Sequence, residues 1–453
     1  MLPNRLVIYG AMAKSSSYRP WRRNLHLNNY IMHSGECLLG ALRRPLWPKL
    51  LQPDGFGRSL QHIKKIHTTS PRYVNPMLVA VLRPLSKMLA VLVGRGFRKW
   101  WQSMPKQKRD LFIQHFIRNK FYYIGGSAVF GFVGHTYYES HVITTPFTKR
   151  RRFMIFNQDQ LHTIAKQIYE EEMAQFGHQR LPQNHHMVDQ VQRVGNRILQ
   201  ANNIIPQLYT KIWTVTVIDD PSDNCFVLPS GDIIMFRGMM DLLENDDQVA
   251  VILAHEMSHV ILEHAAEQLS HGYLLDILIL VPLAVIWAFI PSDGLAVVTH
   301  WFLNKVTQIL LHLPYSRTLE KEADSVGLQL AAKACYDVRE ASAFWGRMSV
   351  MDKLRKERGE TGVNHAWLST HPSHNNRQEM IDSQMSEAII LRHACQCPQL
   401  KSRDPRHSIW MLQKQLTQPS KNKQLKELPA DDLKIIRKST EAPKQNTESL
   451  VNQ

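Results

Sequence analysis

The pattern of apolar and polar positions divides the 453-residue chain into a mainly helical body and several less regular segments. Apolar residues recur every three or four positions over 158–176 and 185–200, which predicts two amphipathic helices. Residues 213–218 alternate and predict a strand, while 225–228 and 232–236 predict a hairpin or a kinked edge strand. Helical spacing resumes near residue 246. We therefore expect a mainly α fold with a small β-sheet, of the α+β class, in one domain over 150–400.

Two apolar regions lie outside this pattern. Residues from Phe121 to Tyr138 carry no charge and have aromatic residues at both ends, so we predict a transmembrane helix over 121–140, an N-terminal membrane anchor. The run is short and contains His135, and a buried core helix is the alternative. Residues 274–313 form a second apolar region, in which each half is short for a full crossing. We expect a hairpin that enters the bilayer or covers a cleft, with two core helices as the alternative.

The segment before the predicted anchor, 73–120, combines an apolar stripe with basic residues. This pattern is typical of a helix that lies on an anionic membrane surface, and packing on protein explains it equally well. At the other end of the chain, residues 403–453 are polar and rich in Lys, Gln and Ser, which predicts a disordered tail.

Charge is concentrated at the start of the chain. Residues 1–72 contain twelve Lys and Arg but only two acidic residues, so they carry +10 of the net +16. Such a composition is typical of a mitochondrial presequence rather than a secretory signal, with a disordered basic tail as the alternative. Charge in the rest of the chain is evenly mixed, so we expect no nucleic-acid partner. Five cysteines do not indicate a disulfide framework.

A metal-binding pattern occurs at His255-Glu256-Met257-Ser258-His259, within a helix predicted over 248–269 and capped by 245–247. Histidines four residues apart share one helix face, so both imidazoles can reach one ion, and zinc accepts imidazole nitrogen. Glu256 lies beside that ion, where it can take a proton from a water whose pKa the ion lowers to about 7. Two core histidines with ordinary hydrogen-bond partners are the alternative.

A catalytic zinc needs a third protein ligand and an open position. His264 is out of step for an extended histidine motif, so a carboxylate from another helix is the remaining option. Glu320 and Asp324 are one turn apart on one face of a helix predicted over 315–335. We assign Glu320 as the third ligand and Asp324 as the residue that orients a ligand imidazole. A solvated, charged helix is the alternative.

These motifs resemble those of the gluzincin membrane peptidases, the family that includes the CAAX prenyl protease and the bacterial heat-shock membrane protease. Residues 224–231 are similar to the strand on which the family lays its substrate, and Thr370-His371-Pro372-Ser373 is similar to its Thr-His-Pro-Ser segment. The resemblance implies a zincin-type metallopeptidase domain in which His371 stabilises the transition state. It also implies that four residues bind substrate by adding a strand: Asn224, Cys225, Phe226 and Val227. Cys225 and Ser230 depart from the family's alanine and glycine.

Within this family, the arrangement is most similar to peptidases of the mitochondrial inner membrane whose activity overlaps that of the m-AAA protease. That resemblance implies a stress-activated, single-pass zinc endopeptidase with one Zn²⁺ per chain and a catalytic domain facing the intermembrane space. Implied substrates are membrane-anchored proteins, including an inner-membrane dynamin-like fusion GTPase, and the chain itself. Anionic lipids and a homo-oligomer are further expected partners. Two alternatives remain, namely a catalytically silent membrane scaffold with a structural zinc and a prenyl-protein protease of the endoplasmic reticulum.

Overall fold

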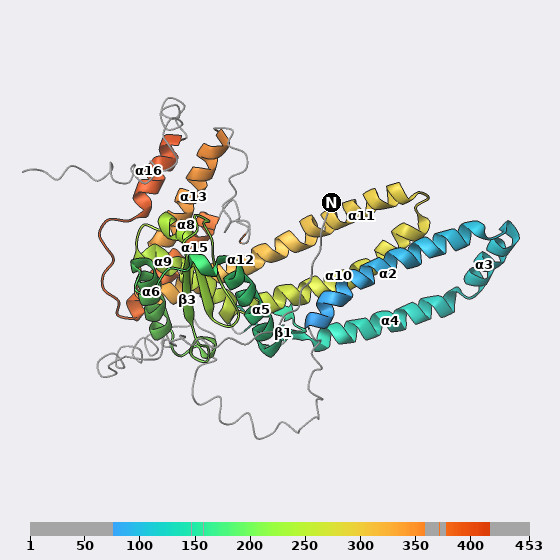
Figure 1. Cartoon of the computed structure of the whole chain (residues 1–453), viewed down its shortest axis with the longest axis horizontal. Helices are drawn as coiled ribbons and strands as arrows, with labels where there is room; N and C mark the ends of the chain where they lie inside the picture. Colours follow the sequence, from blue (N-terminus) through green and yellow to red (C-terminus); the bar gives the residue numbers. More distant parts are fainter. Residues whose placement is uncertain (1–75, 146, 157, 358–370, 372–376, 417–453) are drawn as a thin grey trace, which may run out of the picture.

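The computed structural model describes residues 76–145, 147–156, 158–357, 371 and 377–416 (Figure 1). The predicted presequence over 1–72 therefore lies outside the described residues, as do residues 417–453 of the predicted tail. The described part of that tail differs from the prediction, because residues Arg406–Leu416 form helix α16. Leu412 is buried in this helix, so part of the tail belongs to the folded domain.

The chain forms a helical body with small sheets and a long helical arm (Figure 1). The predicted fold class, mainly α with small β-sheets, is confirmed. The body contains these helices: α5 (Gln158–Phe176), the 3₁₀ turn η2 (Gly177–Gln179), α6 (His186–Ala201), α7 (Pro206–Tyr209), α8 (Arg237–Leu242), α9 (Asp246–Ile261), α12 (Leu313–Lys333), α13 (Arg339–Glu357), α15 (Arg377–Ala394) and α16.

Helix α9 lies at the centre of the body, where most of its side chains are buried. The side chain of Asn245 caps its start by accepting a hydrogen bond of 2.9 Å from the amide of Gln248. The prediction of one continuous helix to residue 269 is wrong, because α9 ends at Ile261. Glu263 takes a left-handed conformation with φ 56°, and α10 begins at the next residue. Arg152 donates to the carbonyl of Leu262 at this break, which satisfies one of the free helix-end carbonyls.

A three-stranded sheet packs beside α9. Strand β5 (Asp232–Phe236) lies between β3 (Thr214–Ile218), to which it is parallel, and β4 (Cys225–Val227), to which it is antiparallel. The predicted strands are thus confirmed, and β4 is one of the two edge strands of this sheet. The turn before β5 needs Gly231, whose φ is 102° and where an added Cβ would stand 2.7 Å from the carbonyl oxygen of Ile212. A second hairpin pairs β1 (Val142–Thr144) with β2 (Arg151–Phe153).

The arm consists of two helical hairpins that lie side by side (Figure 1). Its elements are α2 (Pro76–Ser103), α3 (Lys106–Arg118), α4 (Lys120–Ser140), α10 (His264–Phe289) and α11 (Asp293–Thr307), followed by the π-helical turn η3 (Gln308–His312). Helix α3 forms the far end of the first hairpin, so the start of α2 and the end of α4 both lie beside the body. The described part of the predicted segment over 73–120 thus forms two helices, α2 and α3. The predicted anchor over 121–140 corresponds to α4, the returning helix of the first hairpin.

The two hairpins make polar and close apolar contacts. Asp276 on α10 pairs with Arg83 and Lys87 on α2. At Gly94 the helices approach so closely that an added Cβ would stand 2.3 Å from the carbonyl oxygen of Ala284. Helix α2 therefore packs on protein with one face, and its opposite face is apolar and exposed.

The hairpin predicted over 274–313 is longer than expected. Helix α10 extends back to His264 and continues through Pro282, so it has 26 residues and a length of about 39 Å. Among the described residues, α10 is the one helix that by length and composition is apolar enough to cross a membrane. No residue of α4, which is fully described, is buried. Its assignment as a membrane span stays a prediction.

A disulfide joins Cys335, just after α12, to Cys397, just after α15. The sequence analysis, which found no sign of a disulfide framework in the five cysteines, missed this bond. The two Cα atoms are 5.2 Å apart although the residues are 62 positions apart, a proximity that only the packing of α12 against α15 creates.

Candidate metal centre

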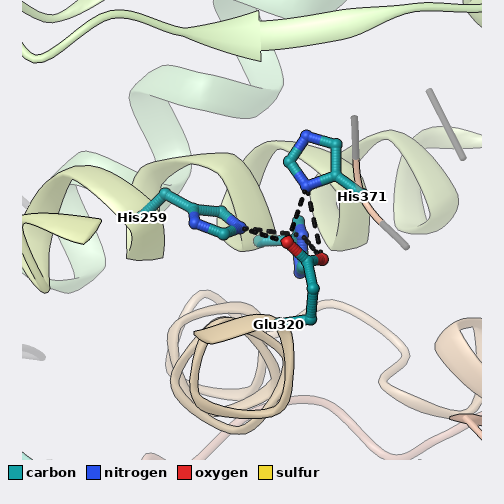
Figure 2. Close-up of side chains that lie close together, drawn as sticks. His259, Glu320 and His371 are labelled. Atoms are coloured by element: carbon teal, nitrogen blue, oxygen red, sulfur yellow. Dashed lines mark hydrogen bonds and ion pairs between the residues drawn. The ribbon is translucent and has the colours of Figure 1, made fainter. Parts of the chain in front are cut away.

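Three side chains from two helices converge at the centre of the body. Nε2 of His255 and Nε2 of His259, on α9, lie 3.2 Å apart. The carboxylate of Glu320, on α12, places one oxygen 3.3 Å from the first nitrogen and the other 3.6 Å from the second. Figure 2 shows Glu320 extending from α12 toward the rings. Since Glu320 is 2% exposed, it does not point into solvent.

His371 completes the group from a different part of the chain. Its Nδ1 lies 3.1 Å and 3.3 Å from the two carboxylate oxygens of Glu320 (Figure 2), and its Nε2 lies 3.4 Å from Oε1 of Glu256. His255, His259, Glu320 and His371 each offer a ligand atom within 4.8 Å of the others. The structure therefore brings Glu256 and His371 to the predicted metal site. It also makes His371 a fourth side chain that could bind a metal.

A second layer of charged groups surrounds these residues. Oδ1 of Asp324 lies 2.9 Å from Nδ1 of His255, the ring nitrogen that faces away from Glu320. Arg377 donates to both oxygens of Asp324, at 2.7 and 2.6 Å, and its Nη1 lies 3.5 Å from Glu320. The Arg377 guanidinium also lies 3.8 Å from the ring centre of Trp345. Asp324 thus lies where the sequence predicts, whereas the sequence motifs assign no role to Arg377.

The charges in this cluster favour a cation. Burial disfavours the protonated ring of His255, but hydrogen bonds to Asp324 and Glu320 outweigh it and raise the pKa of His255 to about 9. Burial likewise opposes ionisation of Glu320, yet His259, His255 and His371 hold the pKa of Glu320 well below its usual range. A metal ion would replace the proton on His255, because a ligand imidazole must be neutral.

The donor set fits zinc. Two imidazoles and one carboxylate are a common protein ligand set in catalytic zinc sites, and the remaining position in such sites is left for water or substrate. All of the candidate donor atoms lie within 4.8 Å of one another, a spacing that a single ion can bridge.

Comparisons with known proteins agree with this geometry. Residues 186–385 match the family model described as "Peptidase family M48". The chain is 38% identical to "Metalloendopeptidase OMA1, mitochondrial" of Danio rerio over 352 residues, which cover 76% of this chain and 72% of that protein. The chain belongs to the family of mitochondrial OMA1 metalloendopeptidases. The resemblance inferred from the motifs is thereby confirmed.

Other OMA1 proteins are similar over much of this chain. The bovine protein is 39% identical over 76% of this chain, and the human protein is 36% identical over 77% of it. These alignments cover 65% and 66% of the two relatives, so the chain spans just under two thirds of their length. Membership of the OMA1 family disfavours the prenyl-protein protease of the endoplasmic reticulum.

The edge strand β4 has one unpaired edge, where the sequence analysis expects substrate to add as a further strand. Backbone groups alternate in direction along β4. Those of Asn224, Phe226 and Leu228 point toward β5, so those of Cys225 and Val227 point away from the sheet. The Asn224 side chain accepts a hydrogen bond of 3.0 Å from the Cys225 amide. A shallow pocket joins this edge to the metal site, with these residues among its lining: Val227, Pro229, His259, Glu263 and Lys211. The substrate-binding role of residues 224–227 stays a prediction.

The two departures from the family's strand do not disturb this edge. The side chain of Cys225 is fully buried in the core, where burial and Glu256 raise the pKa of its thiol. The left-handed turn position falls on Gly231, and Ser230 instead donates a hydrogen bond of 2.6 Å to Asp232. The outer face of β4 therefore depends on neither substitution.

Proposed function

We propose that this chain is a zinc-dependent endopeptidase of the mitochondrial inner membrane, with one Zn²⁺ held by His255, His259 and Glu320. The observation that carries the proposal is the approach of Glu320 to both imidazoles, at 3.3 and 3.6 Å. The name shared by its OMA1 relatives supports peptide-bond hydrolysis.

The bound zinc would supply Lewis-acid activation of water and of the scissile carbonyl group. Glu256 is buried beside the ligands, so it would accept the proton of the attacking water and return it to the leaving amine. His371 would donate a hydrogen bond to the substrate oxygen as negative charge develops on it. Asp324, held by Arg377, would keep His255 in the orientation that binding needs.

A silent scaffold with a structural zinc is the second candidate, and one observation favours it. His371 is close enough to join the other three ligands, and four protein ligands would close the site. In a catalytic site, His371→Ala would retain zinc and lose activity, whereas in a closed structural site it would lose zinc.

The test uses the full-length chain in detergent micelles, with zinc content and cleavage of an unfolded reporter protein as readouts. We expect Glu256→Gln to keep one Zn²⁺ per chain and to lose proteolysis by at least about 100-fold. Glu379→Gln, on the exposed side of α15, is the control and should change neither readout. Persistent cleavage by Glu256→Gln would contradict the proposal.

We further propose that the arm crosses the inner membrane as two hairpins, with the body in the intermembrane space. Helix α10 is longer than the hydrocarbon core of about 30 Å, and apolar side chains are exposed along the arm, including Leu89, Phe130, Val281 and Phe302. Basic residues lie at both ends of the first hairpin, in α3 and at 149–152, so charge alone does not orient the arm. The Cys335–Cys397 disulfide of the body supports its placement in the intermembrane space, because disulfides persist outside reducing compartments.

This placement suits substrates that are themselves anchored in the membrane. The metal site is next to the root of the arm, since the first residue of α10 contacts His259. We propose that an inner-membrane dynamin-like fusion GTPase and the chain itself are cleaved there, and that anionic lipids surround the arm. The expected homo-oligomer and the expected absence of a nucleic-acid partner stay predictions from the sequence.

A further inference from the structure

The two predicted histidine ligands have different partners on their outer ring nitrogens. Nδ1 of His255 faces the carboxylate of Asp324, as the sequence predicts. Nδ1 of His259 instead faces Nδ1 of His264, at 2.9 Å. His264 is 1% exposed and is the first residue of α10, immediately after the break that ends α9. It has no role in the ligand set proposed above.

The hydrogen positions in this contact follow from simple exclusion. A ligand imidazole binds a cation through an unprotonated nitrogen, and Nε2 of His259 is the one that faces Glu320. Nδ1 of His259 therefore carries the proton and donates it to Nδ1 of His264. Because that nitrogen accepts, the proton of a neutral His264 lies on Nε2, which faces Oε2 of Glu322 at 3.4 Å.

Glu322, the hydrogen-bond partner of His264, is itself fixed by three further hydrogen bonds. Arg150 donates to both of its carboxylate oxygens, at 2.8 Å each, and the Thr148 hydroxyl donates at 2.7 Å. Arg150 also pairs with Glu267 on α10, at 2.5 Å. Glu322 and its partners therefore join three parts of the fold: the turn between β1 and β2, helix α12 and the start of α10.

We propose that His264 is a positioning residue of the metal centre, which fixes the tautomer and ring orientation of His259 through its own hydrogen bond to Glu322. The arrangement is a histidine-extended form of the carboxylate–histidine–metal triad. It rests on the proposed role of His259 as a ligand. It also means that the root of the arm contributes directly to the geometry of the metal site, since His264 and Glu267 both belong to α10.

The test measures Zn²⁺ affinity of the full-length chain in micelles by competition with a chromophoric chelator. Loss of an outer-layer partner typically weakens metal binding by about 10–100-fold, which we expect for His264→Ala. His264→Gln should recover most of the affinity, because its amide oxygen can accept from His259 while its amide nitrogen donates to Glu322. Glu322→Gln should weaken binding in the same direction. In the Co²⁺-loaded protein, the visible bands of His264→Ala should shift and those of His264→Gln should not.

His271→Ala is the matched control, because His271 lies on the same helix and stacks on Tyr315 instead of contacting a predicted ligand. It should leave Zn²⁺ affinity within about twofold of the wild type. Wild-type affinity and an unshifted Co²⁺ spectrum in His264→Ala would overturn the inference, as would an equal loss in His271→Ala, which would indicate general loosening of α10. If His264→Ala does not fold, Glu322→Gln and His264→Gln still decide the question. Failure of wild-type protein and of every variant to bind Zn²⁺ would instead overturn the proposed function.

Discussion

Gly327 on α12 lies directly against the backbone of His255 on α9. A Cβ added at Gly327 would stand 2.9 Å from the amide nitrogen of His255 and 3.0 Å from its Cα. Backbone atoms cannot move aside as a flexible side chain can, so this close approach needs a residue without a side chain. It brings α12 near enough for Glu320, about two turns earlier, to reach both imidazoles.

Gly327→Ala should therefore separate the two helices and damage the metal site. We expect a loss of about 1–3 kcal/mol in the free energy of unfolding, as for other overpacked positions, together with weaker Zn²⁺ binding. Chemical denaturation and chelator competition measure the two effects. Gly177→Ala is the control, since an added Cβ there meets nothing within 4 Å. Unchanged stability and affinity in Gly327→Ala would contradict this account.

The ion pairs of Arg377 should matter far more than those on the surface. Arg377→Leu removes the buried guanidinium partner of the Asp324 and Glu320 carboxylates, and breaking a buried ion pair in this way typically costs about 3–5 kcal/mol. Arg193→Leu removes an exposed pair with Asp246 and should cost less than about 1 kcal/mol. Denaturant unfolding of the metal-free proteins compares them directly. Equal losses in the two variants would refute the claim that burial sets the difference.

The pair between Glu322 and Arg150 predicts a specific loss of stability in acid. Burial opposes ionisation of Glu322, but hydrogen bonds from His264, Arg150 and Thr148 lower its pKa from 4.5 to about 2. A lowered pKa stabilises the folded state above pH 4.5, and this contribution is lost progressively as the pH falls toward 2. The melting temperature of the metal-free protein should therefore fall less steeply between pH 5 and pH 3 in Glu322→Gln than in the wild type. The two proteins differ in no other titratable group. Parallel curves for the two proteins would be inconsistent with this pair.

Insertion of both hairpins predicts where a protease can reach the arm. A recognition site for a site-specific protease, inserted after Ser103 at the tip of the first hairpin, should be protected when that protease is added to mitoplasts. A site in the tip of the second hairpin, after Pro291, should be protected as well, and both should be cut after detergent is added. A site after Asn203, on the body, is the positive control. Cleavage at the second tip alone would support the single crossing over 121–140.

Much of the fold follows from local sequence patterns. Alternation and helical spacing are set by which face of an element is buried, so β5 and α5 have the predicted bounds. The end of α9 could not be located in this way, because apolar spacing continues across residues 262–269. The break depends on Glu263 and on the contact of Arg152, a residue more than 100 positions away.

The candidate site shows the same division. His255, His259 and Glu320 could be selected because helical spacing places ligand-type residues on one face. Arg377 and His264 could not, since an arginine and a lone histidine acquire a role only through tertiary contacts with Asp324 and His259. The disulfide between Cys335 and Cys397 likewise depends on how distant segments pack.

The most direct test of the account is the zinc stoichiometry and affinity of full-length protein with and without the carboxylate of Glu320. We predict one Zn²⁺ per wild-type chain, and a loss of at least about 10-fold in affinity for Glu320→Ala, with Glu379→Ala unchanged. Wild-type protein without bound zinc, or Glu320→Ala that binds it as tightly as the wild type, would contradict the central claim.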